Sequence, residues 1–176
     1  MRDRRHDSYS DREIREILDR VKTVAIVGAS GRPSRPSYFV AKYLLAKGYD
    51  VIPVNPGHAG ETIAGAKVFG SLAEIDRPVD MVDVFRNPDE AYGVAQEAIA
   101  IGAKILWMQL GVRNDEAAKL AEQAGLTVVM NRCPKIEYGR LSGEIGWTGV
   151  NSRVLSSRRP GMGTSGIQQR TLGPKR

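Results

Sequence analysis

The hydrophobic positions of the chain fall into short apolar runs, which alternate with segments in which apolar residues recur at helical spacing. The apolar runs predict buried strands at residues 23–28, 50–55, 67–70, 80–85, 104–109 and 126–131. The helical spacing and the helix-start signals predict helices at residues 11–21, 37–48, a short one from 71, 87–101 and 114–125. Ser10 and Ser71 each stand three residues before a glutamate, as in a capping box.

The order of these elements predicts an α/β fold. Strands alternate with helices over short connections, which indicates a mostly parallel sheet. The strands are apolar throughout, as is typical of sheets that are covered on both faces. Pro53 lies inside the second strand and predicts that this strand forms an edge of the sheet or ends there.

The end of the chain has a different composition from the rest. From Gly143 to Arg176 the sequence is rich in Gly, Ser and Arg and shows no hydrophobic period. We therefore expect one domain over residues 1–142, followed by a basic tail over residues 143–176. Apolar residues such as Trp147 give this tail the means to contact a protein partner or a second copy of the chain.

The net charge of +6 is concentrated in this tail, which holds six basic residues and one acidic residue. The part before the tail is therefore close to neutral, which argues against a nucleic-acid-binding domain. No series of aromatic residues accompanies the basic residues of the tail, as stacking on single-stranded nucleic acid requires.

The composition is that of a soluble globular protein, with 41% hydrophobic and 26% charged residues. No apolar run reaches the roughly 18 residues of a membrane-spanning helix, and the N-terminus lacks the apolar region of a secretory signal. Cys133 is the only cysteine, which fits a reducing compartment, so we expect a cytoplasmic protein. One cysteine and two scattered histidines predict no metal site.

Ligands of parallel sheets bind beyond the carboxyl ends of the strands, so the residues that follow each strand are the candidates for a site. After the first strand, Gly28 permits close approach of the backbone and the next helix directs its N-terminus to the same place. Serine hydroxyls and two arginines add donors and positive charge. This loop predicts a phosphate site, with candidate residues Gly28, Ala29, Ser30, Arg32, Ser34, Arg35 and Ser37.

The loop does not follow the dinucleotide pattern Gly-x-Gly-x-x-Gly. Ser30 and Pro33 stand at the second and third glycine positions. The second strand ends at Asn55 where an NAD-binding protein carries an acid, and Asp50 lies at the opposite end of that strand. A ligand with more phosphate than NAD suits two arginines better. NADP and coenzyme A both meet this requirement.

Two further loops carry candidate residues. Phe85, Arg86 and Asn87 follow the fourth strand; Arg86 could reach a phosphate or ribose, Phe85 suits an adenine face or the core, and Asn87 is most simply a helix cap. Gln109 and Gly111 follow the fifth strand, a polar side chain and a residue that admits close backbone approach.

Cys133 follows the last strand, at the position of a candidate nucleophile. His6 and His58 are the only histidines of the chain, and neither is near Cys133 in sequence. A Cys-His pair would require the fold to bring His58 close to it. The alternatives are a packed thiol and a thiol next to a ligand.

Four stretches of the sequence together resemble a known family: "VAIVGASGRPSRPSYFVAKYLLAKGYDVIPVNP", "VDMVDVFRN", "AIAIGAKILWMQLGV" and "AGLTVVMNRCPKIE". They are similar to the small stand-alone coenzyme A-binding proteins, whose domain resembles the N-terminal domain of the succinyl-CoA ligase α subunit. The resemblance covers roughly residues 8–140. It implies a doubly wound Rossmann-type sheet that binds the nucleotide part of coenzyme A.

Carried over by position, the resemblance implies that the Gly28–Ser37 loop holds phosphate and that Asn55 and Pro56 line the next loop. The loops 85–87 and 109–111 would flank the adenosine or the pantetheine arm. Cys133 lies in a stretch typical of the family, with no role assigned. The larger ligases also need an active-site histidine in a second domain and a partner subunit, and neither is found here. The resemblance thus implies binding of coenzyme A or acyl-CoA without catalysis.

Two other functions stay open at this point. An NADP-dependent oxidoreductase would need an acid or base near the nicotinamide, and the sequence offers no His-Asp or Tyr-Lys arrangement for it. A redox role would require Cys133 to form a mixed disulfide with the thiol of bound coenzyme A.

Overall fold

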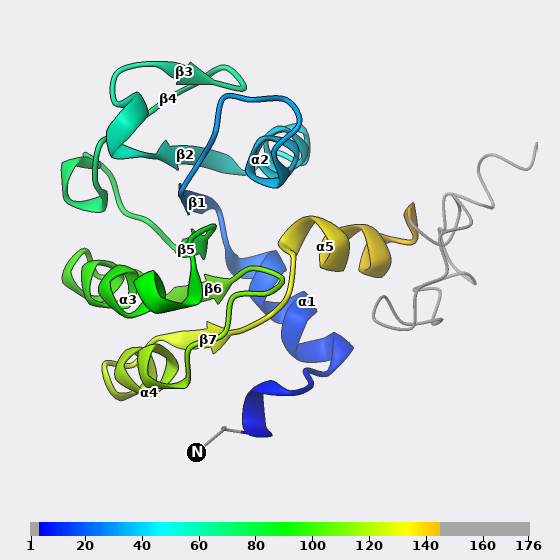
Figure 1. Cartoon of the computed structure of the whole chain (residues 1–176). Coiled ribbons are helices and arrows are strands. Elements are labelled where there is room, and N and C mark those ends of the chain that lie inside the picture. Colours follow the sequence, from blue (N-terminus) through cyan, green and yellow to red (C-terminus); the bar gives the residue numbers. More distant parts are fainter. Residues whose placement is uncertain (1–3, 145–176) are drawn as a thin grey trace, which may run out of the picture. The chain divides into compact units, whose positions relative to one another are not determined.

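A computed structural model describes residues 4–144 of the chain (Figure 1). Its centre is a five-stranded sheet in the order β2-β1-β5-β6-β7, in which every neighbouring pair is parallel. The strands are β1 (Thr23–Val27), β2 (Asp50–Val54), β5 (Met81–Val84), β6 (Ile105–Met108) and β7 (Thr127–Val129). The chain runs outward from β1 to β2 and then returns to β5 on the other side of β1. The predicted α/β, doubly wound, mostly parallel Rossmann-type sheet is thereby confirmed.

The helices are α1 (Asp11–Arg20), α2 (Pro36–Ala46), α3 (Ala91–Ala100), α4 (Asp115–Gln123) and α5 (Pro134–Ser142). Short 3-10 turns are η1 (Arg4–His6), η2 (Pro56–His58), η3 (Leu72–Glu74) and η4 (Pro88–Glu90). A small antiparallel hairpin of β3 (Thr62–Ile63) and β4 (Ala66–Lys67) follows η2.

The described chain divides into two compact units. The first consists of residues 4–8 and 20–133 and holds the sheet with α2, α3 and α4. The second consists of residues 9–19 and 134–144 and holds nearly all of α1 together with α5. The predicted boundary at residue 142 stays a prediction, because residues 145–176 lie outside the described part.

The core of the first unit follows from the alternation of side chains along the strands. One face of the sheet carries Val27, Val84 and Met108 and packs against the alanine-rich sides of α3 and α4. Helix α2 lies on the other face (Figure 1), to which Ile26, Asp83 and Trp107 belong by register. Burial of both faces explains why the strands are apolar throughout.

Within the second unit, α5 buries charged side chains. Arg140 is bonded through its guanidinium to Glu137 and to Asp11 of α1, and the side chains of Arg140 and Glu137 are 5% and 2% exposed. A buried ion pair of this kind tolerates the loss of either partner poorly, because the other charge is then left without compensation.

Most of the predicted elements are present, with two differences. The predicted strand at residues 67–70 does not join the main sheet: β4 pairs with β3, and only Phe69 makes an isolated parallel bridge to Val54. Helix α5 was not predicted, because buried Glu137, Gly139 and Arg140 interrupt its apolar spacing. The prediction that Pro53 marks an edge strand is confirmed, since β2 is the first strand of the sheet.

Candidate functional site

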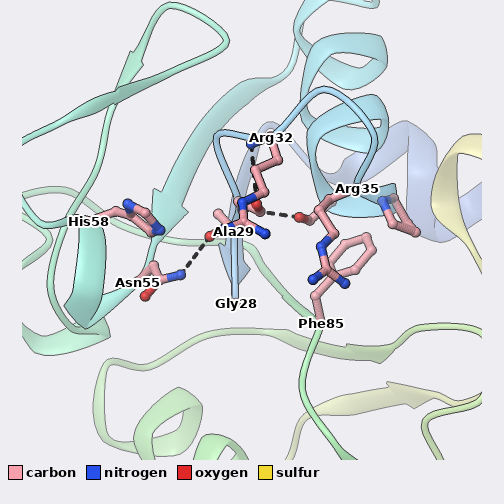
Figure 2. A pocket seen from close by; sticks show the side chains of 10 residues that line it. Gly28, Ala29, Arg32, Arg35, Asn55, His58 and Phe85 are labelled. Atoms are coloured by element: carbon pink, nitrogen blue, oxygen red, sulfur yellow. Dashed lines mark hydrogen bonds between the residues drawn. The ribbon is translucent and has the colours of Figure 1, made fainter.

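A pocket of about 460 Å³ lies at the carboxyl ends of β1 and β2 (Figure 2). This is the side of the sheet on which open α/β folds bind their ligands, close to the point where the strand order reverses between β1 and β5. The pocket is lined by Gly28, Ala29, Ser30, Arg32, Arg35, Pro36, Ser37, Asn55, His58 and Phe85.

Gly28 permits the chain to turn out of β1 directly beside the end of β5. Its φ is +89°, and a Cβ at this position would lie 2.2 Å from the carbonyl oxygen of Phe85. The amide of Gly28 donates to Val54 at 2.9 Å, and the amide of Phe85 donates to Val27 at 2.8 Å. Only glycine fits this contact, so the floor of the pocket depends on it.

The loop that follows is held by its own hydroxyl groups. The amide of Ser30 donates to the hydroxyl of Ser37 at 3.1 Å, and the amide of Arg32 donates to the hydroxyl of Ser30 at 3.3 Å. The amide of Arg35 donates to the carbonyl of Arg32 at 3.0 Å. These serines therefore organise the loop, and its shape is set by bonds within the chain.

Positive charge is concentrated at this loop. Arg32 and Arg35 are exposed and line the pocket, and none of the ten lining residues is acidic. Arg35 is the N-cap of α2 and makes no side-chain cap bond, while Pro36 occupies the first turn. The positive end of the helix dipole therefore meets the pocket without a competing side-chain acceptor, as anion sites at helix N-termini require.

Asn55 joins the two loops that form the pocket. Its side-chain amide Nδ2 donates to the carbonyl of Ala29 at 2.7 Å, and its Oδ1 accepts from the amide of Gly57 at 3.0 Å. A carboxylate at this position could accept from Gly57 but could not donate to Ala29. The departure from the NAD pattern at the end of β2 thus has a structural role: the amide fixes the phosphate loop to the η2 turn.

The structure brings together about half of the residues that the sequence predicted for the site. Eight line the pocket: Gly28, Ala29, Ser30, Arg32, Arg35, Ser37, Asn55 and Phe85. Seven others do not: Ser34, Pro56, Arg86, Asn87, Gln109, Gly111 and Cys133. Pro36 and His58 line it without having been predicted. His58 follows the second strand by four residues, so the rule of strand ends could have found it.

Among the residues outside the pocket, Asn87 takes part in a helix cap. The amide of Asn87 donates to the carboxylate of Glu90 at 3.2 Å, at the start of η4. Asn87 therefore fits the interpretation as a helix cap, and it does not line the pocket.

Gln109 and Asp83 form a buried pair in the sheet. Asp83 of β5 is fully buried, and Nε2 of Gln109 donates to both of its carboxyl oxygens at 3.0 Å. Burial raises the pKa of Asp83 to about 8, against the opposing effect of this bond. Asp83 was not predicted from the sequence, because it is one polar residue inside an apolar strand. Gln109 is itself buried and its amide is engaged with Asp83.

The loops after β6 and β7 are bonded to each other. The amide of Gly111 donates to Oδ1 of Asn131 at 2.8 Å, and the indole Nε1 of Trp107 donates to the carbonyl of Arg132 at 2.8 Å. Gly111 and Asn131 both have positive φ, +80° and +55°. Cys133, which comes next, is buried, so its surroundings fit the packed thiol among the alternatives.

Two other properties concern the described part as a whole. Between residues 4 and 144, no group of three or more His, Cys, Asp or Glu side chains is arranged to hold a metal ion. Each helix in that range is too short or too polar to cross a membrane.

Comparison with known proteins identifies a family and several similar proteins. The family model described as a CoA binding domain matches residues 22–139. The uncharacterized protein YneT of Bacillus subtilis is 43% identical over 129 residues, which are 73% of this chain and 94% of YneT. A hypothetical protein from Pyrococcus horikoshii OT3 shares the fold with a TM-score of 0.74 and 44% identity, over 78% of this chain and 95% of that one.

Part of a larger enzyme subunit is also similar to this chain. Subunit alpha of the ADP-forming acetate–CoA ligase I of Pyrococcus furiosus is 31% identical over 115 residues, which are 61% of this chain and 25% of the ligase subunit. The chain therefore corresponds to about a quarter of that subunit. Since the family match covers the whole sheet and the phosphate loop, the protein belongs to the CoA-binding domain family.

Proposed function

We propose that this protein binds coenzyme A or an acyl-CoA in the pocket at the carboxyl ends of β1 and β2, through the nucleotide part of the ligand. One observation carries the proposal: Arg32, Arg35 and the N-terminus of α2 converge on a pocket without an acidic lining residue. Guanidinium groups pair well with phosphate oxygens. Membership of the CoA-binding domain family supports coenzyme A as the phosphate-rich ligand.

The size and construction of the pocket suit such a ligand. Its volume of about 460 Å³ lies within the range typical of small-molecule sites. The loop is held by Ser30 and Ser37 and stiffened by Pro33 and Pro36, so little order has to be gained on binding. Phe85 offers an aromatic face for the adenine at the wall opposite Asn55 (Figure 2).

We further propose that the protein holds or senses this ligand and performs no chemistry on it. The most strongly perturbed carboxyl group, Asp83, is buried in the sheet and bonded to Gln109, outside the pocket lining. Cys133 is buried and is also outside the lining. The pocket thus presents groups that bind anions, with no nucleophile and base in contact. A single buried cysteine also suits a cytoplasmic protein.

Calorimetric titration with coenzyme A, dephospho-coenzyme A and NADP tests the proposal. We expect coenzyme A to bind more tightly than NADP, and the loss of the 3′-phosphate to weaken binding if an arginine contacts it. NADP binding as tight as that of coenzyme A, together with hydride transfer in a substrate screen, would contradict the proposal and favour an NADP-dependent oxidoreductase.

A further inference from the structure

His58 is the one histidine among the residues that line the pocket. It ends the η2 turn and lies across Gly28 and Ala29 from Arg35 and Phe85 (Figure 2). Its Nδ1 lies 2.9 Å from a carboxylate oxygen of Glu61, and the two side chains are 42% and 61% exposed. Histidine is the residue type that ordinarily gains or loses a proton near neutral pH, whereas arginine stays charged.

The backbone holds both members of this pair in place. The amide of His58 donates to the carbonyl of Asn55 at 3.1 Å, and the amide of Glu61 donates to the carbonyl of His58 at 3.0 Å. Glu61 is also bonded to Val68, the residue directly after β4, since its carbonyl accepts from the amide of Val68 at 2.9 Å. Asn55 in turn bonds the phosphate loop through Ala29. The fold therefore fixes the backbone of this turn relative to the phosphate loop.

Glu61 determines what the imidazole offers to a ligand. A carboxylate accepts a proton donor, so the Nδ1–H of His58 is directed to Glu61 in the neutral ring, and Nε2 keeps a lone pair. A lone pair repels a phosphate oxygen. When the ring is protonated, Nε2 carries a hydrogen and becomes a charged donor to the same oxygen.

We propose that His58, oriented by Glu61, makes the affinity of the pocket for a phosphate ligand depend on pH, with tight binding when the imidazole is protonated and weaker binding when it is neutral. The inference rests on the proposed function, since the phosphate belongs to the coenzyme A nucleotide. It adds a regulation of that site by pH.

The other charged groups around His58 give a constant background. Arg32 and Arg35 line the same pocket, and Glu61, three residues after His58 in the chain, lies 2.9 Å from its Nδ1. Arginine does not lose its proton in proteins. A change in affinity between pH 5.5 and 8 therefore reports on His58 and on the ligand's own phosphate, whose second ionisation lies near pH 6.

The test is calorimetric titration of the full chain with coenzyme A at pH 5.5 and pH 8. At pH 5.5, we expect wild type to bind coenzyme A about tenfold more tightly than His58→Gln. This is the contribution of one charge-assisted hydrogen bond from a part-exposed group. This advantage should vanish at pH 8. His58→Lys keeps a charged donor at both pH values and should bind tightly at both. The ionisation of the ligand's own phosphate affects wild type and variants equally. The ratio of their affinities at one pH therefore reports on His58.

A matched control is available because the chain has one other histidine, outside the pocket. His6→Gln should keep the wild-type ratio between the two pH values, while Glu61→Ala should reduce it, since the ring then loses its fixed tautomer. Parallel pH profiles of wild type and His58→Gln would overturn this inference and leave the proposed function standing. Absence of coenzyme A binding by wild type at both pH values would overturn both.

Discussion

Gln109 donates a hydrogen bond to both carboxyl oxygens of Asp83 at 3.0 Å, inside a parallel sheet where Asp83 has no exposed surface. The bond from Gln109 favours the ionised form of Asp83, but burial outweighs it. With its pKa raised to about 8 by burial, Asp83 is mostly neutral at pH 7. In the register of the sheet, Asp83 lies between Ile26 of β1 and Trp107 of β6, on the same face.

Replacing Asp83 by Asn should remove a pH dependence of stability. In the unfolded chain the carboxyl ionises near pH 3.9, so from about pH 4 to pH 8 the folded state binds the extra proton. The stability that this proton provides is complete below pH 4 and is lost as pH rises toward 8. Relative to Asp83→Asn, the free energy of unfolding of wild type should fall by roughly 1 kcal/mol per pH unit across this range.

Urea denaturation of both proteins at pH 5, 6, 7 and 8 measures this difference. Asp76→Asn, at a carboxylate whose side chain is 77% exposed, serves as the control and should follow wild type. Identical pH profiles for wild type and Asp83→Asn would show that Asp83 is ionised in the folded state.

Asp80 should show the opposite behaviour, because it anchors the starts of three strands. Its carboxylate accepts from the amides of Lys22 and Thr23 at 2.9 and 3.2 Å and from Lys104 at 2.8 Å. Burial alone would raise the pKa of Asp80, but these donors lower it below its usual value. Asp80→Ala should lower the free energy of unfolding by about 1–3 kcal/mol at pH 7.

The contribution of Asp80 should disappear in acid. Since the folded-state pKa is lowered, the stabilisation is present above the unfolded value and is lost as pH falls through the folded value. The difference in melting temperature between wild type and Asp80→Ala should therefore narrow as pH falls below the unfolded value of about 3.9. A gap that is as large at pH 3 as at pH 7 would contradict the assignment.

Gly28→Ala should harm the protein more than the same change at another glycine of positive φ. Gly28 and Gly125 have φ of +89° and +90°, but a Cβ meets the Phe85 carbonyl only at Gly28 and has open space at Gly125. Gly125→Ala should cost about 1 kcal/mol from backbone strain. Gly28→Ala should cost clearly more and abolish coenzyme A binding. Equal shifts in melting temperature for the two variants would show that the contact with β5 is unimportant.

Asn55→Asp tests the bridge between the phosphate loop and the η2 turn. The carboxylate keeps the bond from Gly57 but loses the donor to Ala29, and it places negative charge at the pocket. We expect coenzyme A to bind at least tenfold more weakly, and the free energy of unfolding to fall by about 1 kcal/mol. Asn87→Asp, outside the pocket lining, should bind normally. Unchanged affinity in Asn55→Asp would remove Asn55 from the site.

The sequence predicted the sheet and most of the phosphate loop because these depend on local signals. Apolar runs mark the strands, and a loop that begins with Gly28 directly after β1 can only lie at the carboxyl edge of a parallel sheet. Two of the three serines of that loop, Ser30 and Ser37, and both of its arginines line the pocket, while Ser34 does not. Pro53, which lacks a backbone donor, predicted that β2 forms an edge or ends there, and β2 is an edge strand.

The features that the sequence did not predict depend on contacts between distant residues. His58 reaches the pocket because Asn55 bonds Ala29, 26 residues earlier. Asp83 is bonded inside the sheet by Gln109, which follows it by 26 residues. Helix α5 buries Arg140, whose guanidinium bonds Asp11, 129 residues earlier, so its spacing of apolar residues is lost. In each case the role of a residue depends on a bonding partner that is distant in the sequence, so the sequence alone does not reveal it.

The most direct test of the central claim is the affinity for coenzyme A of wild type, of the double variant Arg32→Ala/Arg35→Ala, and of Arg12→Ala as control. Arg12 is an exposed arginine of α1 that pairs with Glu16, outside the pocket. Each pocket arginine that bonds a phosphate contributes about 1.5–3 kcal/mol, so the double variant should bind at least a hundredfold more weakly while Arg12→Ala binds like wild type. Equal affinity in all three proteins, measured by calorimetry, would contradict the claim that this pocket holds coenzyme A.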